Sequence, residues 1–185
     1  MADIRIAHYD AAGANTLRET IADIHRDAYS ARISSGDPFA SPESFMRRFD
    51  SHARNASFGF VIADVGDEAV GQAWGFPQAP TFGDLPGGLP DDPAIAGLGF
   101  QEGEQVFGLC EIMVRQAWTG QGIAHRLHDA LLAGRPERFA ELYVRPDNAR
   151  ACRAYLKWGW CKVGEKRPDL PGAPLFDVLV LPLAG

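Results

Sequence analysis

The sequence is constrained most by a short apolar run that leads through two glycines into an amphipathic segment. Residues 109–114 are long enough for a buried strand and too short for a helix. After the glycines, apolar residues recur at helical spacing over residues 123–131. Gly120 and Gly122 allow a sharp turn, and without a Cβ they let a ligand approach the main chain. We therefore predict a strand, a glycine turn and a helix, in that order.

The predicted turn has the properties of an anion site. The first amides of a helix have no internal partner, and they lie at the positive end of the helix dipole. Such a turn suits phosphate or pyrophosphate. The P-loop pattern G-x-x-x-x-G-K-[ST] is absent from the sequence. A dinucleotide-binding motif would need a small residue where His125 stands. Neither of these two classes of nucleotide-binding protein therefore fits.

The segment resembles the acetyl-CoA-binding motif of the GCN5-related N-acetyltransferases. In that family a strand ending in Val leads through a turn of the form [QR]-x-x-G-x-[GA] into a helix. Val114, Gly122 and Ala124 occupy the matching positions. Thr119 stands where the family prefers Arg or Gln. This departure removes a side-chain contact but leaves the backbone amides of the turn.

A second motif of the same family follows in the expected order. Residues 148–160 read N-x-x-A-x-x-x-Y-x-K-x-G-W, which looks like the family signature N-x-x-A-x-x-x-Y-x-x-x-G-[FY]. Two such matches in one chain are improbable by chance. The resemblance covers residues 70–180, and the first third of the chain fits only in outline.

The resemblance implies the acyl-CoA N-acyltransferase fold, of the α/β (α+β) class. We expect a mixed, mostly antiparallel sheet of about seven strands flanked by about four helices. A chain of 185 residues is long enough for one domain with a substantial core, so we assign residues 1–185 to a single domain. In this fold, acetyl-CoA enters where the fourth and fifth strands splay apart.

Local patterns place the other elements. Thr16 and Glu19 have the spacing of a capping box, which predicts a first helix that continues to Ile33. Ser41 followed by Pro42 predicts the start of a second helix. The remaining predictions are strands over 4–9, 58–64, 69–76, 142–144, 160–163 and 175–181, and a helix over 148–158 that Gly159 ends.

Composition narrows the function classes. The net charge of −6 argues against a nucleic-acid-binding protein, which should present a basic face. No apolar run approaches the ~20 residues that span a bilayer, and the first residues lack the pattern of a secretion signal. We therefore expect no membrane partner and a cytoplasmic location. The three cysteines match no zinc pattern and are expected to be reduced core thiols.

Residues 77–105 are predicted to form a Pro/Gly-rich loop insertion. The stretch carries five acidic residues and no Lys or Arg. A loop of this length inside a compact domain is usually functional or disordered. Two interpretations stay open: a solvated excursion without a role, or a lid that supplies negative charge to a cationic amine substrate.

N-acetyl transfer needs a neutral amine, a polarised thioester carbonyl and a proton for the departing thiolate. Because lysine-like amines titrate at about 10.4, a base helps. Glu111 interrupts the apolar strand where the family often has a Glu, and it is our candidate base. The alternative is a structural carboxylate paired with a neighbour. Tyr155 matches the family tyrosine near the CoA sulfur and is our candidate acid, with core packing as the alternative.

The resemblance implies that acetyl-CoA, the co-substrate, binds along the strand end, the turn, the helix start and the later motif. A backbone amide of the strand that ends in Val114 would polarise the acetyl carbonyl. Asn148 would bond near the pantetheine arm, cap a helix, or both. Arg126 would reach a phosphate or remain solvated. The predicted contact set is Ile112, Met113, Val114, Thr119, Gly120, Gln121, Gly122, Ile123, Ala124, His125, Arg126, Asn148 and Tyr155.

We expect no metal. His125 and His128 are three residues apart and could meet on a helix, but the sequence shows no evident third ligand. Acyl transfer of this kind requires no metal.

The sequence thus predicts an N-acetyltransferase that moves an acetyl group from acetyl-CoA to a primary amine of a small molecule or peptide, by direct transfer in a ternary complex. One alternative is a CoA-binding sensor or pseudoenzyme without turnover. Another is a transferase for a longer acyl chain. A homodimer is possible, because dimers are common in the family.

Overall fold

The computed structural model describes residues 3–82, 85, 99, 103–169 and 172–183. The chain divides into two compact units, one of Met1–Phe76 with Leu109–Ala133 and the other of Pro77–Gly108 with Gly134–Gly185. The assignment of residues 1–185 to a single domain stays a prediction.

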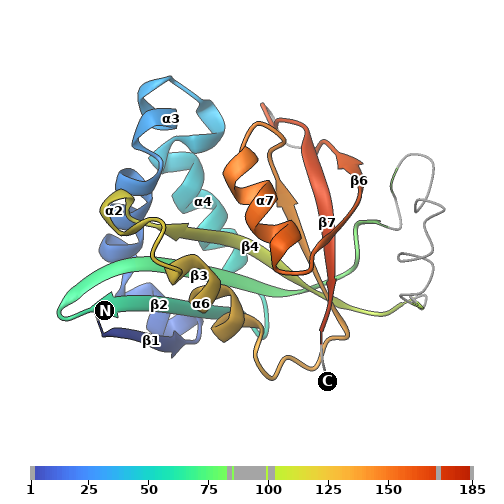
Figure 1. The fold of residues 1–185 in the computed structure, drawn as a ribbon, viewed down its shortest axis with the longest axis horizontal. Coiled ribbons are helices and arrows are strands. Elements are labelled where there is room, and N and C mark those ends of the chain that lie inside the picture. Colours follow the sequence, from blue (N-terminus) through green and yellow to red (C-terminus); the bar gives the residue numbers. More distant parts are fainter. Residues whose placement is uncertain (1–2, 83–84, 86–98, 100–102, 170–171, 184–185) are drawn as a thin grey trace. The chain divides into compact units, whose positions relative to one another are not determined.

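Seven strands form a mixed, mostly antiparallel sheet, and four main helices accompany it, as the sequence predicts (Figure 1). The strands are β1 (Ile4–Tyr9), β2 (Gly59–Val65), β3 (Glu68–Gln78), β4 (Val106–Val114), β5 (Phe139–Val144), β6 (Cys161–Lys166) and β7 (Phe176–Pro182). Their order in the sheet is β1-β2-β3-β4-β5-β7-β6. The helices are α1 (Ala11–Thr16), α2 (Arg18–Ala28), α3 (Ser30–Ser34), α4 (Pro42–His52), α6 (Ile123–Leu132) and α7 (Ala149–Lys157), with short 3₁₀ turns η1 (Pro38–Ala40) and η3 (Gln116–Trp118).

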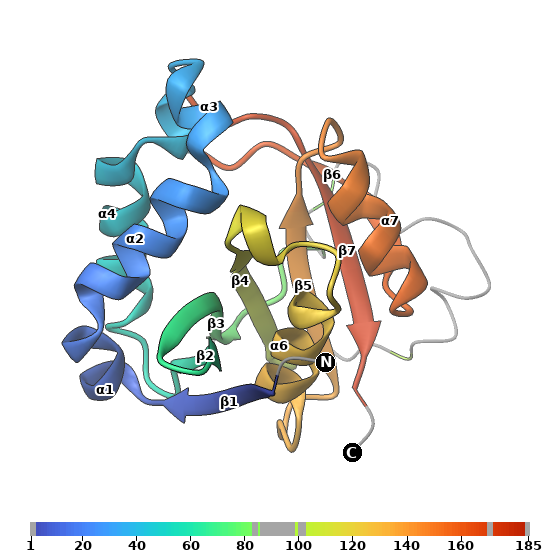
Figure 2. The ribbon, with the colours of Figure 1, turned by 60° about the vertical axis from the view of Figure 1, so that its left-hand side comes forward.

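In the first unit, helices lie on both faces of the strands. β1 pairs antiparallel with β2, and β2 with β3. Helices α1, α2 and α4 lie on one side of these strands and α6 on the other (Figure 2). The core between α2, α4 and the strands is aromatic: Trp74 packs against Phe45 and Phe49 with ring centroids 5.4 and 5.5 Å apart. Aromatic burial of this kind is the main stabilising contribution to such a core.

The packing of α6 on the strands depends on a glycine. An ideal Cβ built at Gly71 in β3 would lie 3.0 Å from Leu127 Cδ1 and 3.0 Å from the carbonyl oxygen of Met113. On the opposite face, the neighbouring Gln72 donates from Nε2 to the carbonyl of Ile21 in α2 at 3.0 Å. The missing side chain at Gly71 therefore sets how closely α6 approaches β3 and β4.

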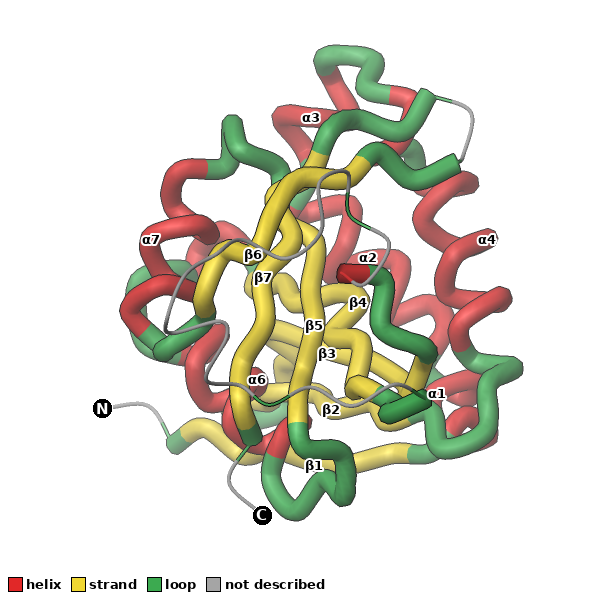
Figure 3. Tube along the Cα trace, turned by 90° about the vertical axis from the view of Figure 1, so that its right-hand side faces the viewer, coloured by secondary structure: helices red, strands yellow, loops and turns green. Residues whose placement is uncertain are grey.

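The second unit contains the three strands β5, β7 and β6 side by side (Figure 3). Both of its ladders are antiparallel, with Leu142 opposite Leu179 and Lys166 opposite Phe176. A small apolar core of this unit includes Phe82 and Leu85 together with residues of all three strands. The closing antiparallel pair of strands predicted from the sequence is present, and its first strand is longer than expected.

The first helical region differs from the sequence prediction. Instead of one helix from Thr16 to Ile33, the chain forms α1, α2 and α3 in succession. Asp10 begins α1, because its carboxylate accepts a hydrogen bond from the amide of Gly13 at 2.8 Å. Thr16 does not act as a cap, since its hydroxyl donates to the carbonyl of Gly13 at 2.7 Å. The capping-box assignment at Thr16 and Glu19 is therefore wrong.

The signals predicted at Ser41, Gly66 and Gly159 are confirmed. Ser41 caps α4 by accepting from the amide of Ser44 at 3.2 Å, and Pro42 is the first helical residue. Gly66 turns between β2 and β3 with φ +59°, and Gly159 follows α7 with φ +93°. The three cysteines form no disulfide with one another. Within the described ranges, no helix is both long and apolar enough to cross a membrane.

The acidic insertion is only partly visible. β3 extends through Gln78, so the insertion begins later than residue 77. Four of its five acidic residues, Asp84, Asp91, Asp92 and Glu102, lie outside the described residues. The fifth, Glu104, accepts a hydrogen bond from Arg138 at 3.1 Å. The choice between a lid and a passive excursion therefore stays open.

Candidate active site

The predicted glycine turn is present at the start of α6. Gly120 and Gly122 have φ +82° and +79°, and Gly122 is the N-cap residue of the helix. These angles lie in the left-handed region, which residues with a side chain adopt at a cost. An ideal Cβ at either glycine would have no heavy atom of the described residues within 4 Å. Glycine is thus required by the backbone conformation, and the space beside the turn is open.

The positive end of α6 is not neutralised by its own residues. Gly122 supplies no capping side chain, and the first turn of the helix contains no acidic residue. The amides of that first turn have no acceptor within the helix. Residues 119–122 are exposed to solvent. The turn therefore presents backbone donors and a helix dipole to solvent, which is the arrangement that binds a phosphate group.

The connection between β4 and this turn is fixed at several points. The amide of Arg115 donates to the carbonyl of Val70 in β3 at 2.8 Å. Gln116 donates from its amide to the carboxylate of Asp27 at 3.0 Å, and from its side chain to the hydroxyl of Ser30 at 2.6 Å. Because β3, α2 and α3 all hold this short connection, the turn is anchored to the first unit.

The side chains of the turn are engaged with the chain itself. Thr119 donates from its hydroxyl to the carbonyl of Gln116 at 2.9 Å, and Gln121 from its side-chain amide to that of Ala117 at 3.5 Å. Arg126 is exposed, and its Nη2 donates to the carbonyl of Ile4 at 2.7 Å. The contact of Arg126 with a phosphate stays a prediction.

The remaining cofactor residues of the first unit divide by burial. Met113 is buried and its sulfur accepts a hydrogen bond from Gln72 at 3.3 Å, and Ile123 is also buried. Ile112, Val114 and Ala124 are half-buried, whereas the side chain of His125 is half exposed. A contact between CoA and the two buried residues would therefore involve their backbone.

Glu111 is paired with an arginine from α4. Arg48 donates to Glu111 Oε1 from Nε at 3.4 Å and from Nη2 at 3.2 Å. Its Nη1 donates to the carbonyl of Phe39 at 2.9 Å, and its guanidinium lies 4.2 Å from the centroid of the Phe39 ring. Both bonds from Arg48 fall on Oε1 of Glu111, and no described residue donates to Oε2.

The environment of this pair changes the proton affinity of nearby groups. Burial raises the pKa of the Glu111 carboxyl, and the positive charge of Arg48 offsets part of that rise. Burial, together with the charge of Arg48, lowers the pKa of His25 and of His52 to about 4. Both histidines are therefore neutral at pH 7. A carboxyl with a raised pKa is better matched to proton transfer near neutral pH than an ordinary Glu.

Asn148 and Tyr155 belong to the second unit. Asn148 caps α7, with Oδ1 accepting from the amide of Ala151 at 3.2 Å. Tyr155 is 7% exposed and makes edge-to-face contacts with Trp158 and Trp160, with ring centroids 5.5 and 5.9 Å apart. The structural roles that the sequence left open for both residues are thus present, and their roles toward CoA stay predictions.

The structure brings Glu111 and the glycine turn into one unit and places Asn148 and Tyr155 in the other. Sequence reasoning missed Arg48, which lies 63 residues before Glu111 and carries no motif. It also missed Asp129, whose carboxylate lies close to His125 and His128. The spacing of four residues between His125 and Asp129 is the signal that was overlooked.

A family model described as the acetyltransferase (GNAT) family matches residues 18–160. The chain belongs to this family. GNAT proteins are acetyl-CoA-dependent N-acetyltransferases that acetylate amine acceptors. The match includes Glu111, the glycine turn and the whole of the later motif at residues 148–160. A comparison with curated proteins gives no significant match.

Solved GNAT structures share the fold. NAA60 from Arabidopsis thaliana in complex with acetyl-CoA superimposes with a TM-score of 0.67 at 16% identity, covering 97% of this chain and 99% of that one. The ribosomal-protein-S18-alanine N-acetyltransferase from Escherichia coli gives 0.62 at 16% identity, covering 99% and 96%. The aminoglycoside N-acetyltransferase AAC(6')-Iy in complex with CoA gives 0.58 at 14% identity, covering 92% and 94%. At these identities the likeness shows the fold alone.

Proposed function

We propose that this GNAT protein transfers an acetyl group from acetyl-CoA to a primary amine by direct transfer in a ternary complex. The observation that carries the proposal is the exposed turn at Gly120 and Gly122, which starts α6 without a side-chain cap or an acidic residue. This turn would hold the pyrophosphate of acetyl-CoA through backbone amides. Two solved relatives of the same fold contain acetyl-CoA or CoA, which supports the choice of co-substrate.

Glu111 is the proposed general base. It would take a proton from the attacking amine, directly or through a water molecule, so that the amine nitrogen forms its bond to the acetyl carbon. Its raised pKa and the vacant side at Oε2, which no described residue bonds, support this role. The pairing with Arg48 keeps the carboxylate oriented and opposes its protonation.

Tyr155 is the proposed general acid. As the bond between the acetyl carbon and sulfur breaks, the phenol would give its proton to the departing thiolate. Asn148 is proposed to bond near the pantetheine arm while it caps α7. The position of both residues in the second family motif supports these roles, and the transfer leaves no covalent intermediate on the protein.

The acceptor is proposed to be the primary amine of a small molecule or a peptide. A transferase for a longer acyl chain and a CoA-binding sensor without turnover are the alternatives. A panel of amines with acetyl-CoA, followed by free thiol release and CoA affinity together, separates them. Amine-dependent thiol release supports the transferase, whereas CoA binding without release for any amine favours the sensor.

The turn itself is tested by Gly122→Glu. The variant should lose detectable CoA binding, because a side chain enters the turn and adds negative charge beside the pyrophosphate. The measurement is CoA affinity by calorimetry. Gly66→Glu is a matched control: Gly66 also has a positive φ and open space around it, but it lies in the β2–β3 turn. Unchanged affinity in a folded Gly122→Glu protein would refute this placement of the site.

A further inference from the structure

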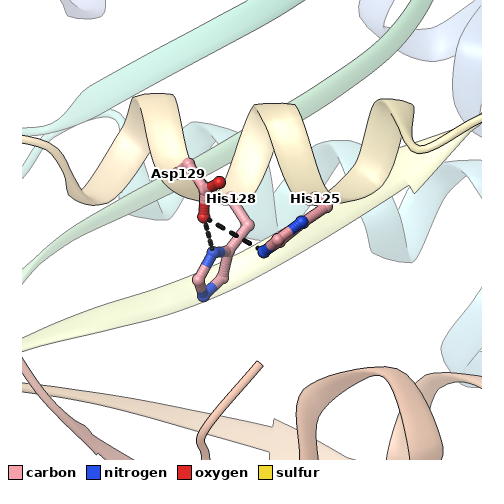
Figure 4. Close-up of side chains that lie close together, drawn as sticks. All are labelled: His125, His128 and Asp129. Atoms are coloured by element: carbon pink, nitrogen blue, oxygen red, sulfur yellow. Dashed lines mark hydrogen bonds and ion pairs between the residues drawn. The ribbon is translucent and has the colours of Figure 1, made fainter. Parts of the chain in front are cut away.

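Three potential metal ligands converge on one side of α6. His125, His128 and Asp129 project toward one another from successive turns of the helix (Figure 4). Asp129 Oδ1 lies 2.8 Å from His128 Nδ1 and 3.5 Å from His125 Nε2. The three donor atoms all lie within 4.8 Å of one another. Spacings of three and four residues place the side chains on the same helix face.

The two distances to Asp129 are compatible with coordination of a metal ion. Zn²⁺ binds imidazole nitrogen and carboxylate oxygen at about 2.0–2.2 Å in tetrahedral geometry, so two of its ligand atoms lie roughly 3.3 Å apart. The two distances to Asp129 Oδ1 bracket this value. His125 is half exposed and can rotate to bring its nitrogen closer, whereas the side chain of His128 is only 5% exposed and is held in place.

We propose that His125, His128 and Asp129 bind a divalent transition-metal ion such as Zn²⁺, with the remaining coordination position left to water. Two imidazoles and one carboxylate form a donor set that suits zinc and its neighbours and disfavours Mg²⁺ and Ca²⁺, which prefer oxygen ligands. The 2.8 Å contact between His128 and Asp129 is the metal-free form of the site, and the ion would take the place between the donors.

The site can be occupied without acetyl transfer, although His125 also belongs to the predicted CoA contact set. Its three side chains all lie on α6, and its occupancy requires neither CoA nor an amine. Because the ligands come from two successive helical turns, a bound ion would cross-link these two turns of α6. Since the folded chain presents the three donors together and the unfolded chain does not, metal binding should also stabilise the fold.

The test is titration of the chelator-treated, full-length protein with Zn²⁺ by calorimetry, alongside thermal unfolding. The expected result is one ion per chain and a melting temperature that rises with zinc concentration. Asp129→Asn should bind zinc at least about tenfold more weakly, and His125→Ala/Asp129→Asn should bind it far more weakly still. His128 is left unaltered because it is buried. His8→Ala, which removes an exposed histidine from β1, is the matched control and should bind zinc like the wild type.

A spectrum with Co²⁺ distinguishes this site from the thiols. Coordination by nitrogen and oxygen gives visible d–d bands without a sulfur charge-transfer band in the near ultraviolet. A strong sulfur band would place the ion on Cys110, Cys152 or Cys161 and would overturn the proposal. Wild-type zinc affinity in the folded double variant, or no binding of Zn²⁺ or Co²⁺ by the wild type, would overturn it as well.

Discussion

The chain buries one glutamate in β4 and another in β5, and the two are satisfied in opposite ways. Glu111 is 13% exposed in its side chain and bonds to a cation, Arg48, at a single oxygen. Glu141 is 1% exposed and bonds to neutral donors. Its carboxylate accepts from the amide of Thr81 at 3.2 Å, from the Thr81 hydroxyl at 2.5 Å and from Gln78 at 3.1 Å.

The donors around Glu141 tie the end of β3 and the segment that follows it to β5. The Thr81 hydroxyl also bonds to the phenol of Tyr143, and Lys166 donates to the carbonyl of Thr81 at 3.4 Å. The hydrogen bonds that the Glu141 carboxylate accepts from Thr81 and Gln78 therefore hold the chain together. Glu111 has one oxygen engaged by Arg48, and this difference separates a carboxylate that fastens a segment from one that is proposed to exchange a proton.

Burial raises the pKa of both carboxyls, so the pKa by itself does not distinguish them. The groups that oppose this rise in pKa do distinguish the two carboxyls. For Glu141 the groups that lower the pKa are mainly hydrogen-bond donors from Thr81 and Gln78, whereas for Glu111 the charge of Arg48 comes first. A perturbed carboxyl is thus a functional candidate only when its hydrogen bonds leave an oxygen for a substrate.

The largest expected effect is on turnover in Glu111→Gln. The amide oxygen can still accept from Arg48, so the fold should be kept, but the proposed general base is lost. We expect kcat/KM for the preferred amine to fall by about 10²–10⁴-fold, with CoA affinity unchanged. Steady-state thiol release measures the rate and calorimetry the affinity. Wild-type turnover in this variant would make Glu111 a structural carboxylate like Glu141.

The matched change Glu141→Gln should affect stability instead. Replacing a charged acceptor of three hydrogen bonds should cost about 2 kcal/mol in the free energy of unfolding, measured in urea, with kcat for the folded protein unchanged. The pKa of Glu141 is raised in the folded protein. Its contribution to the free energy of unfolding is therefore full below the unfolded pKa of 4.5, and it declines as pH rises through the folded pKa. The difference in the free energy of unfolding between the wild type and Glu141→Gln should therefore become smaller as the pH rises. A large loss of kcat in Glu141→Gln would contradict the assignment of a purely structural role to Glu141.

The smallest expected effect is a displacement of the pH profile in Arg48→Met. Without the cation, the pKa of Glu111 rises further, and a base must be deprotonated to act. The acidic limb of the kcat/KM profile should therefore move to higher pH. The loss of kcat/KM relative to the wild type should then be greater at pH 6 than at pH 9. Arg48→Lys keeps the charge and should leave the limb near its wild-type position. Superimposable profiles for the two variants would mean that Arg48 only packs against Phe39.

Features governed by near neighbours could be predicted from the sequence. A cap, a positive φ or an apolar period depends on a few adjacent residues, so Ser41, Gly66, Gly122 and Gly159 all indicated the right element ends. The exception is the start of the first helix. Two possible caps, Asp10 and Thr16, lie six residues apart there. Asp10 caps the helix, whereas the Thr16 hydroxyl donates to the carbonyl of Gly13. Local pattern alone did not rank the two.

Pairings across the chain could not be predicted in the same way. Arg48 and Glu111 are 63 residues apart, and Thr81 and Glu141 are 60 apart. Within its own segment of the sequence, each of these partners resembles an ordinary surface residue. The sequence identified Glu111 through its position in a strand, but whether it acts as a base or as half of an ion pair depends on which side chain α4 brings to it. That information is held in tertiary packing.

Because Gly71 has no side chain, this chain should tolerate mutation at residue 71 less well than at exposed positions. Exposed positions can change with little effect on the fold, but one methyl group at residue 71 would meet Leu127 and the backbone of Met113. To relieve that close contact, Leu127 in α6 or the Met113 backbone in β4 must give by a few tenths of an ångström, and both elements lead directly to the glycine turn although no residue of the turn has changed. In a survey of natural variants, a glycine at this position therefore deserves the same weight as the glycines of the turn.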